Sequence, residues 1–470
     1  MIDRLIKIIL IFLLIFTPLA FGSMELWALT VMEFGILAMI ALYAIGEMFF
    51  GEELLKEKRC ASAAPADSKT KTAERYRIPI FLLGLFLALI LFQMIPLPPG
   101  VLKTLSPKTY ELRRHFAFPF EGGETTFWPI SLFPYATKVE FLKWAALIVF
   151  FIFLLYWKGF GRGLKGAAPF LITIMGVGIA ESLYGIFEYF SGHRHILHIE
   201  APRLVNSVTG TFINPNYFAG YLLMVIPLSV GYLFAREAEQ EFHYRGWRHR
   251  LASLDGKTLL MWFGILVMIL GLIFSASRTG IVCLLFSFGV ISLLFRDSRG
   301  GKRLSWPLIF IFTLAVAWAA WIGLEAVIGR FSTVPEDFLF RKNVWENTLG
   351  IIKDFPLLGT GLGTFAQIFP VYQSFPLLAS ITHAENDYLQ LASEMGIIGI
   401  LSLLVAFFLI SLKILSRIHS LSFLDSRRFI VVNATIGILA ILLHSFFERN
   451  IQVPSNALYF LGIVGIIIKI

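Results

Sequence analysis

The sequence is dominated by apolar runs, each close to the length that a helix needs to cross a lipid bilayer. Such a helix takes about 20 consecutive apolar residues, and the 470-residue chain contains twelve runs of this kind. Hydrophobic residues make up 57% of the chain and charged residues only 15%, which excludes a soluble enzyme, a disordered chain and a small disulfide-linked module. We therefore predict an all-α polytopic membrane protein with about 12 transmembrane helices, forming a single membrane domain over residues 1–470. The predicted spans are 5–22, 26–46, 79–96, 138–157, 167–190, 217–235, 259–275, 280–295, 306–326, 390–412, 429–447 and 455–468.

The first apolar run has two interpretations. Arg4 and Lys7 precede it, as basic residues precede the apolar core of a signal peptide. The run is long, however, and the second apolar run follows almost at once. We predict that it is retained as a span, with cleavage as the alternative.

The positions of the Lys and Arg residues predict the orientation. Cytoplasmic loops of helical membrane proteins collect Lys and Arg. With the N-terminus inside, the cytoplasmic segments hold 26 of the 40 basic residues, and every even-numbered connection is basic. We predict that both termini are cytoplasmic and that 47–78 is a cytoplasmic loop. The net charge of +9 then reflects membrane topology, and no nucleic acid partner is expected. The outside segments are 97–137, 191–216, 276–279, 327–389 and 448–454.

Two of the predicted outside loops are long. Loop 97–137 follows the third span, and the large loop 327–389 lies between the ninth and tenth. In the large loop, Phe340, Val344, Trp345, Leu349 and Ile352 recur at helical spacing and stop before a proline. This pattern predicts an amphipathic helix on the membrane surface.

Familiar metal and nucleotide motifs are missing from the sequence. The two cysteines, Cys60 and Cys283, lie in a charged loop and an apolar run, so neither a structural disulfide nor a cysteine metal site is expected. There is no HExxH motif and no Asp-x-Asp pair. The GTGLG stretch at 359–363 lacks the Lys-Ser/Thr of a phosphate-binding loop. We therefore predict no metal and no cofactor.

The polar segment 203–220, RLVNSVTGTFINPNYFAG, opens a predicted helix at the outer face. Asn214 and Pro215 form a turn, and Asn216 is the predicted N-cap. The free N–H groups and the dipole of a helix N-terminus favour an anion, and Arg203 would add a full positive charge. An ordinary capped loop is the alternative.

The segment 275–280, SASRTG, places Arg278 in a tight turn between two spans on the outer side. The tendency of basic residues to lie inside does not explain an arginine there. It is either part of a binding site or reaches the lipid headgroups.

The segment 382–390, THAENDYLQ, begins another span. Thr382 and Glu385 have the spacing of a capping box, which gives Glu385 a structural role. His383 has no such explanation and is followed closely by Asn386 and Asp387. We regard His383 as a candidate catalytic residue, although a single histidine is more often structural.

Two further groups of polar residues could have either a functional or a purely structural role. The short outer connection HSFFERN contains His444, Glu448 and Arg449, for which internal pairing is the alternative. Glu181 and Glu188 lie seven residues apart on one face of the fifth span. They either line a polar cavity or form hydrogen bonds inside the bundle.

The outer residues together suggest a reaction. Arginine binds a diphosphate in a bidentate manner, and a histidine of ordinary pKa can remove a proton from a hydroxyl near neutral pH. A diphosphate leaves as a stable anion, and arginines can stabilise the charge that develops on it. The sequence therefore favours group transfer from a lipid diphosphate at the outer leaflet.

Five motifs also resemble those of the O-antigen ligase/polymerase superfamily. They are GTFINPNYFAGYL, SRTG, PLLGTGLGTF, HAENDYLQLASEMGIIG and HSFFERNIQVPSNAL, and they follow one another from about residue 200 to the C-terminus. The resemblance implies a GT-C-like fold with a large periplasmic loop between helices 9 and 10, in the bacterial inner membrane. It also implies metal-independent, inverting transfer of glycan from undecaprenyl diphosphate to a lipid A–core hydroxyl.

The resemblance further implies roles for individual residues. His383 would be the base or would position the acceptor, and Arg278 would bind the diphosphate. Arg203 would act similarly, although it lies further before GTF than the usual arginine of the family, and Arg341 is a fourth candidate. Glu448 stands where the family commonly has an aspartate, and Asn214, Asn216 and Asn386 would be supporting polar residues.

The motifs leave the precise reaction open. Polymerisation of O-antigen or exopolysaccharide and protein O-glycosylation occur in the same superfamily. A lipid-glycan transporter is an alternative of another class, and it would require charged residues along a path through several spans. Here most of the polar candidates lie outside the spans, which favours a transferase.

Overall fold

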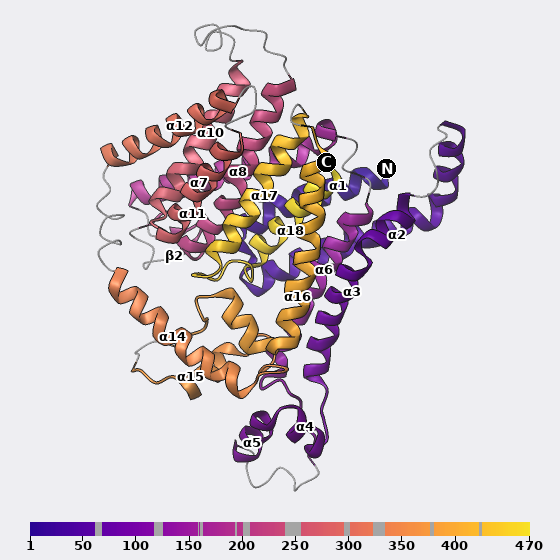
Figure 1. The fold of residues 1–470 in the computed structure, drawn as a ribbon, viewed down its shortest axis with the longest axis vertical. Coiled ribbons are helices and arrows are strands. Elements are labelled where there is room, and N and C mark those ends of the chain that lie inside the picture. The colour runs from indigo at the N-terminus through magenta and orange to yellow at the C-terminus, as the bar shows by residue number, and fades with distance from the viewer. Residues whose placement is uncertain are drawn as a thin grey trace.

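A helix overlaps each of the twelve predicted spans in the computed structural model (Figure 1). The structure describes residues 1–61, 68–116, 126–157, 159, 163–192, 195–200, 207–239, 255–295, 301–322, 334–376, 380–422 and 425–470. The twelve helices are α1 (Ile2–Leu19), α2 (Leu26–Ala61), α3 (Ser68–Met94), α6 (Pro134–Tyr156), α7 (Gly163–Ser191), α8 (Pro215–Glu239), α10 (Gly256–Phe274), α11 (Arg278–Leu294), α12 (Gly301–Ile322), α16 (Asp387–Ser420), α17 (Ser426–His444) and α18 (Pro454–Lys469).

Eight of the twelve are long and apolar enough to cross a membrane, judged by length and composition over the described residues. They are α2, α3, α6, α7, α8, α10, α16 and α17. Shorter apolar helices are α11, α18 and the 309–318 part of α12. Helix α1 carries three charged residues in its first turns, Asp3, Arg4 and Lys7. The prediction of an all-α polytopic membrane protein is confirmed.

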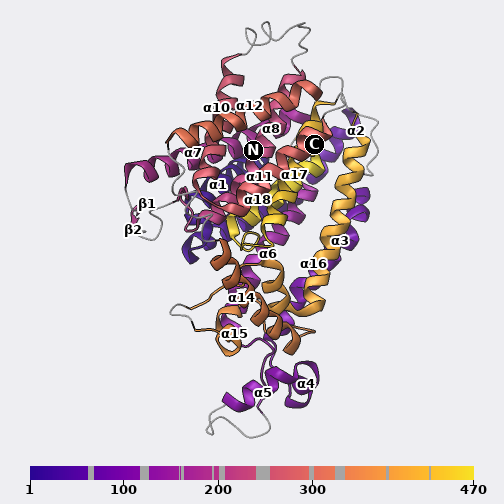
Figure 2. The same cartoon turned by 60° about the vertical axis from the view of Figure 1, so that its left-hand side comes forward.

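The remaining elements lie in the connections, and all of them except α14 are short. They are η1 (Phe21–Ser23), α4 (Pro99–Leu105), α5 (Pro107–Phe116), α14 (Val334–Asp354), α15 (Phe365–Tyr372) and a hairpin of β1 (His195–Ile196) with β2 (Ile199–Glu200). Helices α4, α5, α14 and α15 gather at the lower end of the molecule, away from both chain termini (Figures 1 and 2). The two long predicted outside loops therefore lie at the same end.

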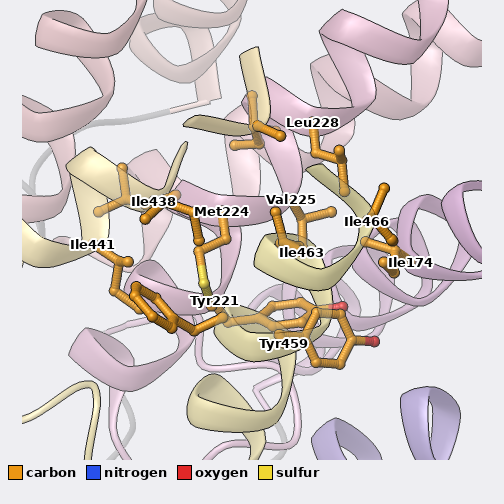
Figure 3. Packing of buried hydrophobic residues seen from close by; sticks show 14 of the residues in the cluster. Ile174, Tyr221, Met224, Val225, Leu228, Ile438, Ile441, Tyr459, Ile463 and Ile466 are labelled. Atoms are coloured by element: carbon orange, nitrogen blue, oxygen red, sulfur yellow. The ribbon is translucent and has the colours of Figure 1, made fainter. Parts of the chain in front are cut away.

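Helix α8 forms the centre of the bundle. Residues 217–235 of this helix are all buried, and its neighbours include α7, α10, α17 and α18. Glycines allow α17 to approach closely, since a Cβ at Gly437 would lie 3.0 Å from the Met224 carbonyl oxygen. On another side, the Tyr221 ring packs edge-on against Tyr459 with centroids 4.9 Å apart (Figure 3). This packing fixes the N-terminus of α8, where the polar segment ends.

Helix α16 is broken at Gly396, whose φ of 63° and ψ of −175° are not helical. The GTGLG loop fills the break, because Gly361 N–H donates to the Glu394 carbonyl and Ile397 N–H donates to the Pro356 carbonyl, at 3.0 and 2.8 Å. The Gln93 side chain of α3 also donates to the Glu394 carbonyl, at 2.9 Å. Backbone groups freed inside a membrane need such partners. The glycines of this motif therefore have a structural use.

Helix α14 is the longer of the two helices, α14 and α15, that lie within the predicted large loop. Its buried face includes Val344, Thr348 and Ile351, all 0% exposed, whereas Leu349 is 45% exposed. Val344 and Ile351 share a small apolar core with α15 residues, Ile381 and Ala384. The Trp345 indole N–H donates to the Ala384 carbonyl at 3.1 Å. Much of the apolar face thus packs on protein, where it anchors the loop that carries His383.

Candidate active site

A cavity of about 260 Å³ lies where the starts of α8, α11 and α14 meet two loops. Its wall is largely polar and comes from five segments that are far apart in the sequence. It contains five of the eight predicted site residues. The lining residues are Asn214, Asn216, Ala276, Arg278, Thr279, Asp337, Phe340, Arg341, Glu385 and Glu448.

Asn214 caps the start of α8. The helix begins at Pro215, and the Asn214 Oδ1 accepts a hydrogen bond from the Asn216 N–H at 2.8 Å. The prediction that Asn216 is the N-cap is therefore wrong by two residues. Proline suits the first helical position because it has no N–H to leave unpaired and its φ is already helical. Asn216 lies in the first turn and lines the cavity.

Arg278 is the first residue of α11. The Ser277 side chain caps this helix by accepting from the Gly280 N–H at 3.3 Å, and the preceding Ala276 has a φ of 53°. The Arg278 side chain is 22% exposed and forms an ion pair with Asp337 of α14. It therefore points into the cavity wall and not toward lipid headgroups.

Arg341 of α14 forms a second ion pair, with Glu448 in the turn between α17 and α18. The Glu448 side chain is only 3% exposed. Burial raises the pKa of Glu448, while the charge of Arg341 acts in the opposite direction. Each of the two predicted cationic residues in the cavity thus has a carboxylate partner that an anionic ligand could replace.

Glu385 does not form the predicted capping box. Helix α16 begins at Asp387, and its N-cap is Asn386, whose Oδ1 accepts from the Tyr388 and Leu389 N–H groups at 3.0 Å. Glu385 precedes the cap with a φ of 52° and lines the cavity. Its carboxyl group lies near that of Glu448, and each affects the pKa of the other. Burial raises the pKa of Glu385.

His383 lies beside the cavity and not in its lining. The Arg449 Nη1 is 2.7 Å from its Nε2 and 3.1 Å from its Nδ1. Burial first, and the charge of Arg449 second, lower the pKa of His383 to about 3. Because a guanidinium can only donate hydrogen bonds, the imidazole beside it is held in the neutral form.

A buried network fixes the turn between α17 and α18. The Asp387 Oδ2 accepts from the N–H groups of Asn450 and Ile451 at 2.8 and 2.7 Å. The fully buried His444 has its Nδ1 2.9 Å from Asn450 Nδ2 and its Nε2 3.3 Å from the Ser277 hydroxyl. These bonds connect the start of α11 to the turn that carries Glu448 and Arg449.

Sequence reasoning missed several of the polar residues near the site. Lys143 and Glu140 of α6 pair at 2.6 Å, with side chains 4% and 19% exposed, and the Lys143 Nζ also reaches the Gln452 carbonyl at 3.3 Å. The signal was available, since these two charges lie three residues apart inside a predicted span. Nothing in the local sequence indicated that Asp337 would line the cavity or that Arg449 would contact His383.

Arg203 lies outside the residues that the structure describes. Within the described part of the chain, no group of three or more His, Cys, Asp or Glu side chains is arranged to hold a metal ion.

Comparison with known proteins finds a family model that matches part of the chain. A search of curated proteins finds no match. Residues 263–404 match the family model described as O-Antigen ligase. This segment runs from α10 into α16 and includes Arg278, Arg341 and His383. The match supports a transferase role in general terms, and it confirms that this membrane protein resembles the O-antigen ligase superfamily.

Proposed function

We propose that the protein is an O-antigen ligase, which transfers glycan from undecaprenyl diphosphate to a hydroxyl of lipid A–core. The cavity would face the periplasm, with the chain in the inner membrane and both termini in the cytoplasm. The observation that carries the proposal is the convergence of Arg278 and Arg341 with the capped start of α8 on one cavity of about 260 Å³.

The cavity has the groups that a diphosphate requires. Arginine forks match phosphate oxygens in a bidentate manner, and the start of α8 adds a helix dipole and N–H groups. Arg278 and Arg341 are now held by Asp337 and Glu448. These ion pairs orient the arginines before the donor arrives. Phosphate oxygens of the donor would then replace the carboxylates. Asn214 and Asn216 would add amide hydrogen bonds.

The proposed reaction is a single displacement at the anomeric carbon. The acceptor oxygen forms the new glycosidic bond on one face while the bond to the diphosphate oxygen breaks on the other, which inverts the configuration. The electron pair leaves with the diphosphate. Arg278 and Arg341 stabilise the negative charge that develops on it, which is how preorganised donors lower such barriers.

His383 would be the base or would position the acceptor. The contact with Arg449 favours positioning, because a neutral imidazole beside a guanidinium is a weak proton acceptor but can still hold a hydroxyl. Asn386, the cap of α16, would fix the loop on which His383 lies.

The same site would serve an O-antigen or exopolysaccharide polymerase or a protein O-oligosaccharyltransferase. A lipid-glycan transporter would need polar residues through the full depth of the bundle. The buried ionisable groups Lys143 and Glu181 instead lie in the halves of their helices nearest the end with α14 and α15, which supports a transferase.

A deletion strain tests the proposal. Loss of the ligase should leave lipopolysaccharide without any O-chains, and the lipid-linked polymer should accumulate. Core capped with a single repeat unit would instead indicate a polymerase. Normal lipopolysaccharide with a defect only in a glycosylated protein would indicate an oligosaccharyltransferase. A strain that carries the full-length gene with the single substitution Arg278→Ala serves as the comparison. It should show the same lipopolysaccharide defect as the deletion strain if the cavity is the active site.

A further inference from the structure

The lining of the cavity contains more acidic than basic residues. Arg278 and Arg341 are the basic ones, and Asp337, Glu385 and Glu448 are the acidic ones. Each arginine is also paired with one of these carboxylates. Opposite charges attract and like charges repel, so binding of a diphosphate becomes stronger if a further cation lies next to the cavity.

Arg449 is a buried arginine that has no carboxylate partner. It is 9% exposed, and within the described part of the chain no Asp or Glu forms an ion pair with it. Its hydrogen-bond contacts there are those of Nη1 with the two ring nitrogens of His383. Arg113, by contrast, donates to two backbone carbonyl oxygens. A buried charge is costly unless it is paired and hydrogen-bonded, so the environment of Arg449 requires an explanation.

The contact with His383 uses only one end of the guanidinium group. The Arg449 Nε is buried and has no partner among the described residues, and Nη2 makes no hydrogen bond to any of them. The N–H groups of Nε and Nη2 point in parallel, and such a pair matches two oxygens of a phosphate. Arg449 therefore has a bidentate edge that no protein group of the described chain uses.

Two segments hold this edge next to the cavity. Arg449 directly follows Glu448, which lines the cavity, and its partner His383 comes two residues before Glu385, which lines it as well. The two residues after Arg449 are fixed, because their backbone N–H groups donate to the Asp387 carboxylate at 2.8 and 2.7 Å. The position of the arginine is thus set before any ligand binds.

We propose that Arg449 is a third arginine that binds the diphosphate of the donor, an inference that rests on the proposed function. A phosphate that replaces Glu448 at Arg341 lies against the segment that carries Arg449. The Nε and Nη2 groups donate to two of its oxygens, while Nη1 keeps its contact with His383. The same side chain thereby connects the diphosphate to the residue that positions the acceptor.

The test is the binding of undecaprenyl diphosphate to purified full-length protein in nanodiscs. Hydrogen bonds to charged groups are among the stronger ones, so the Kd of Arg449→Gln should be at least about tenfold higher than that of the wild type. Arg449→Lys keeps the charge but lacks the fork, and its Kd should lie between the other two. Arg427→Gln is the matched control, because Arg427 pairs with Asp425 at the opposite end of α17.

A double variant separates donor binding from support of His383. If Arg449 only held the imidazole in place, Arg449→Gln would lower turnover and leave the donor Kd unchanged, as we expect for His383→Ala. We expect instead that Arg449→Gln raises the Kd by the same factor in the His383→Ala background, because Nε and Nη2 do not contact His383.

Three results would overturn the inference. These are a wild-type Kd in Arg449→Gln, an effect on the Kd that disappears in the His383→Ala background, and a higher KM for lipid A–core with an unchanged donor Kd. If Arg449→Gln does not fold, Arg449→Lys decides, and wild-type affinity in that variant would overturn the inference. A wild-type protein that binds undecaprenyl diphosphate but transfers no glycan to lipid A–core would refute the proposed ligase function and leave this inference standing.

Discussion

Arg341 and Glu448 form an ion pair although 107 residues separate them in the sequence. Arg341 lies on α14 in the large loop, and Glu448 lies in the short turn between the last two helices. The contact holds the loop against the bundle at the cavity wall. The second Glu448 oxygen, Oε2, is buried and has no hydrogen-bond partner among the described residues, and Glu385 lines the same cavity.

Arg278→Lys should impair transfer more strongly than conservation of charge would suggest. The ammonium group of lysine lacks the planar fork that binds a diphosphate through two parallel hydrogen bonds. We expect donor affinity to fall by about tenfold, which corresponds to about 1.4 kcal/mol. Binding of undecaprenyl diphosphate to the purified variant measures this. Arg236→Lys is the control, because Arg236 pairs with Asp255 away from the cavity. Unchanged affinity and turnover would refute diphosphate binding by Arg278.

His383→Ala should abolish transfer while folding and donor binding stay nearly intact. Misplacement of a reactant by about 1 Å can cost about a hundredfold in rate, and we expect at least this loss. Because burial and Arg449 lower the pKa of His383 to about 3, its titration should not contribute to the pH dependence of turnover near neutrality. His195→Ala is the control, because His195 is the exposed residue of strand β1. Turnover equal to that of the wild type would reject a role for His383.

Glu181→Gln should be tolerated, whereas Glu181→Leu should not. The fully buried Glu181 contacts the Thr211 N–H and hydroxyl at 2.8 Å, and the same hydroxyl is 2.9 Å from the Pro18 carbonyl oxygen. The Thr211 hydroxyl has only one hydrogen to donate. If it donates to the Pro18 carbonyl, the Glu181 carboxyl must be protonated and donate to the hydroxyl oxygen. A glutamine amide can do the same.

The measurement is transfer activity together with the apparent melting temperature in detergent. Loss of buried hydrogen bonds should destabilise Glu181→Leu by about 1–3 kcal/mol. It should also lower turnover, because the loop through Thr211 leads to Asn214 in the cavity. Glu188→Leu, two turns further along α7 and partly exposed, is the control. Equal damage in the glutamine and leucine variants would contradict this hydrogen-bond arrangement.

Gly396→Ala should destabilise the protein. A Cβ at this position would collide with the Leu357 carbonyl, and the φ of 63° disfavours any side chain. We expect a loss of at least about 1–3 kcal/mol, the cost of one residue held in a disfavoured conformation. Thermal unfolding in detergent measures it. Gly289→Ala in α11 is the control, since, apart from its chain neighbours and the backbone of its own helix, no described heavy atom lies within 4 Å of the added carbon. Equal melting temperatures would show that the break in α16 is not constrained.

The sequence predicted the helices well but their ends less well. Hydropathy averaged over 20 residues reports a local property, so each predicted span has a helix over it. Capping depends on a single residue, and here two local patterns gave wrong predictions. The N-cap of α8 is Asn214 and not Asn216, and Glu385 lies before the start of α16 and not in its first turn. The break at Gly396 was also missed, because a glycine in an apolar run has no local sign of the loop that docks on it.

The candidate site, like the fold, could be predicted from the sequence only in part. The sequence identified Arg278 as a charged residue without a sufficient structural reason next to an apolar span, because ionisable groups are costly at such positions. Asn214 was predicted as part of a turn, internal pairing was the alternative for Glu448, and Arg341 was named only through the family resemblance. Only the tertiary structure brought these residues into one cavity, paired Arg449 with His383 and placed Glu385 in the cavity lining. These contacts join segments up to 107 residues apart. Hydropathy acts along the chain and is readable from it, whereas the pairing of charges depends on the packing of helices that local sequence does not specify.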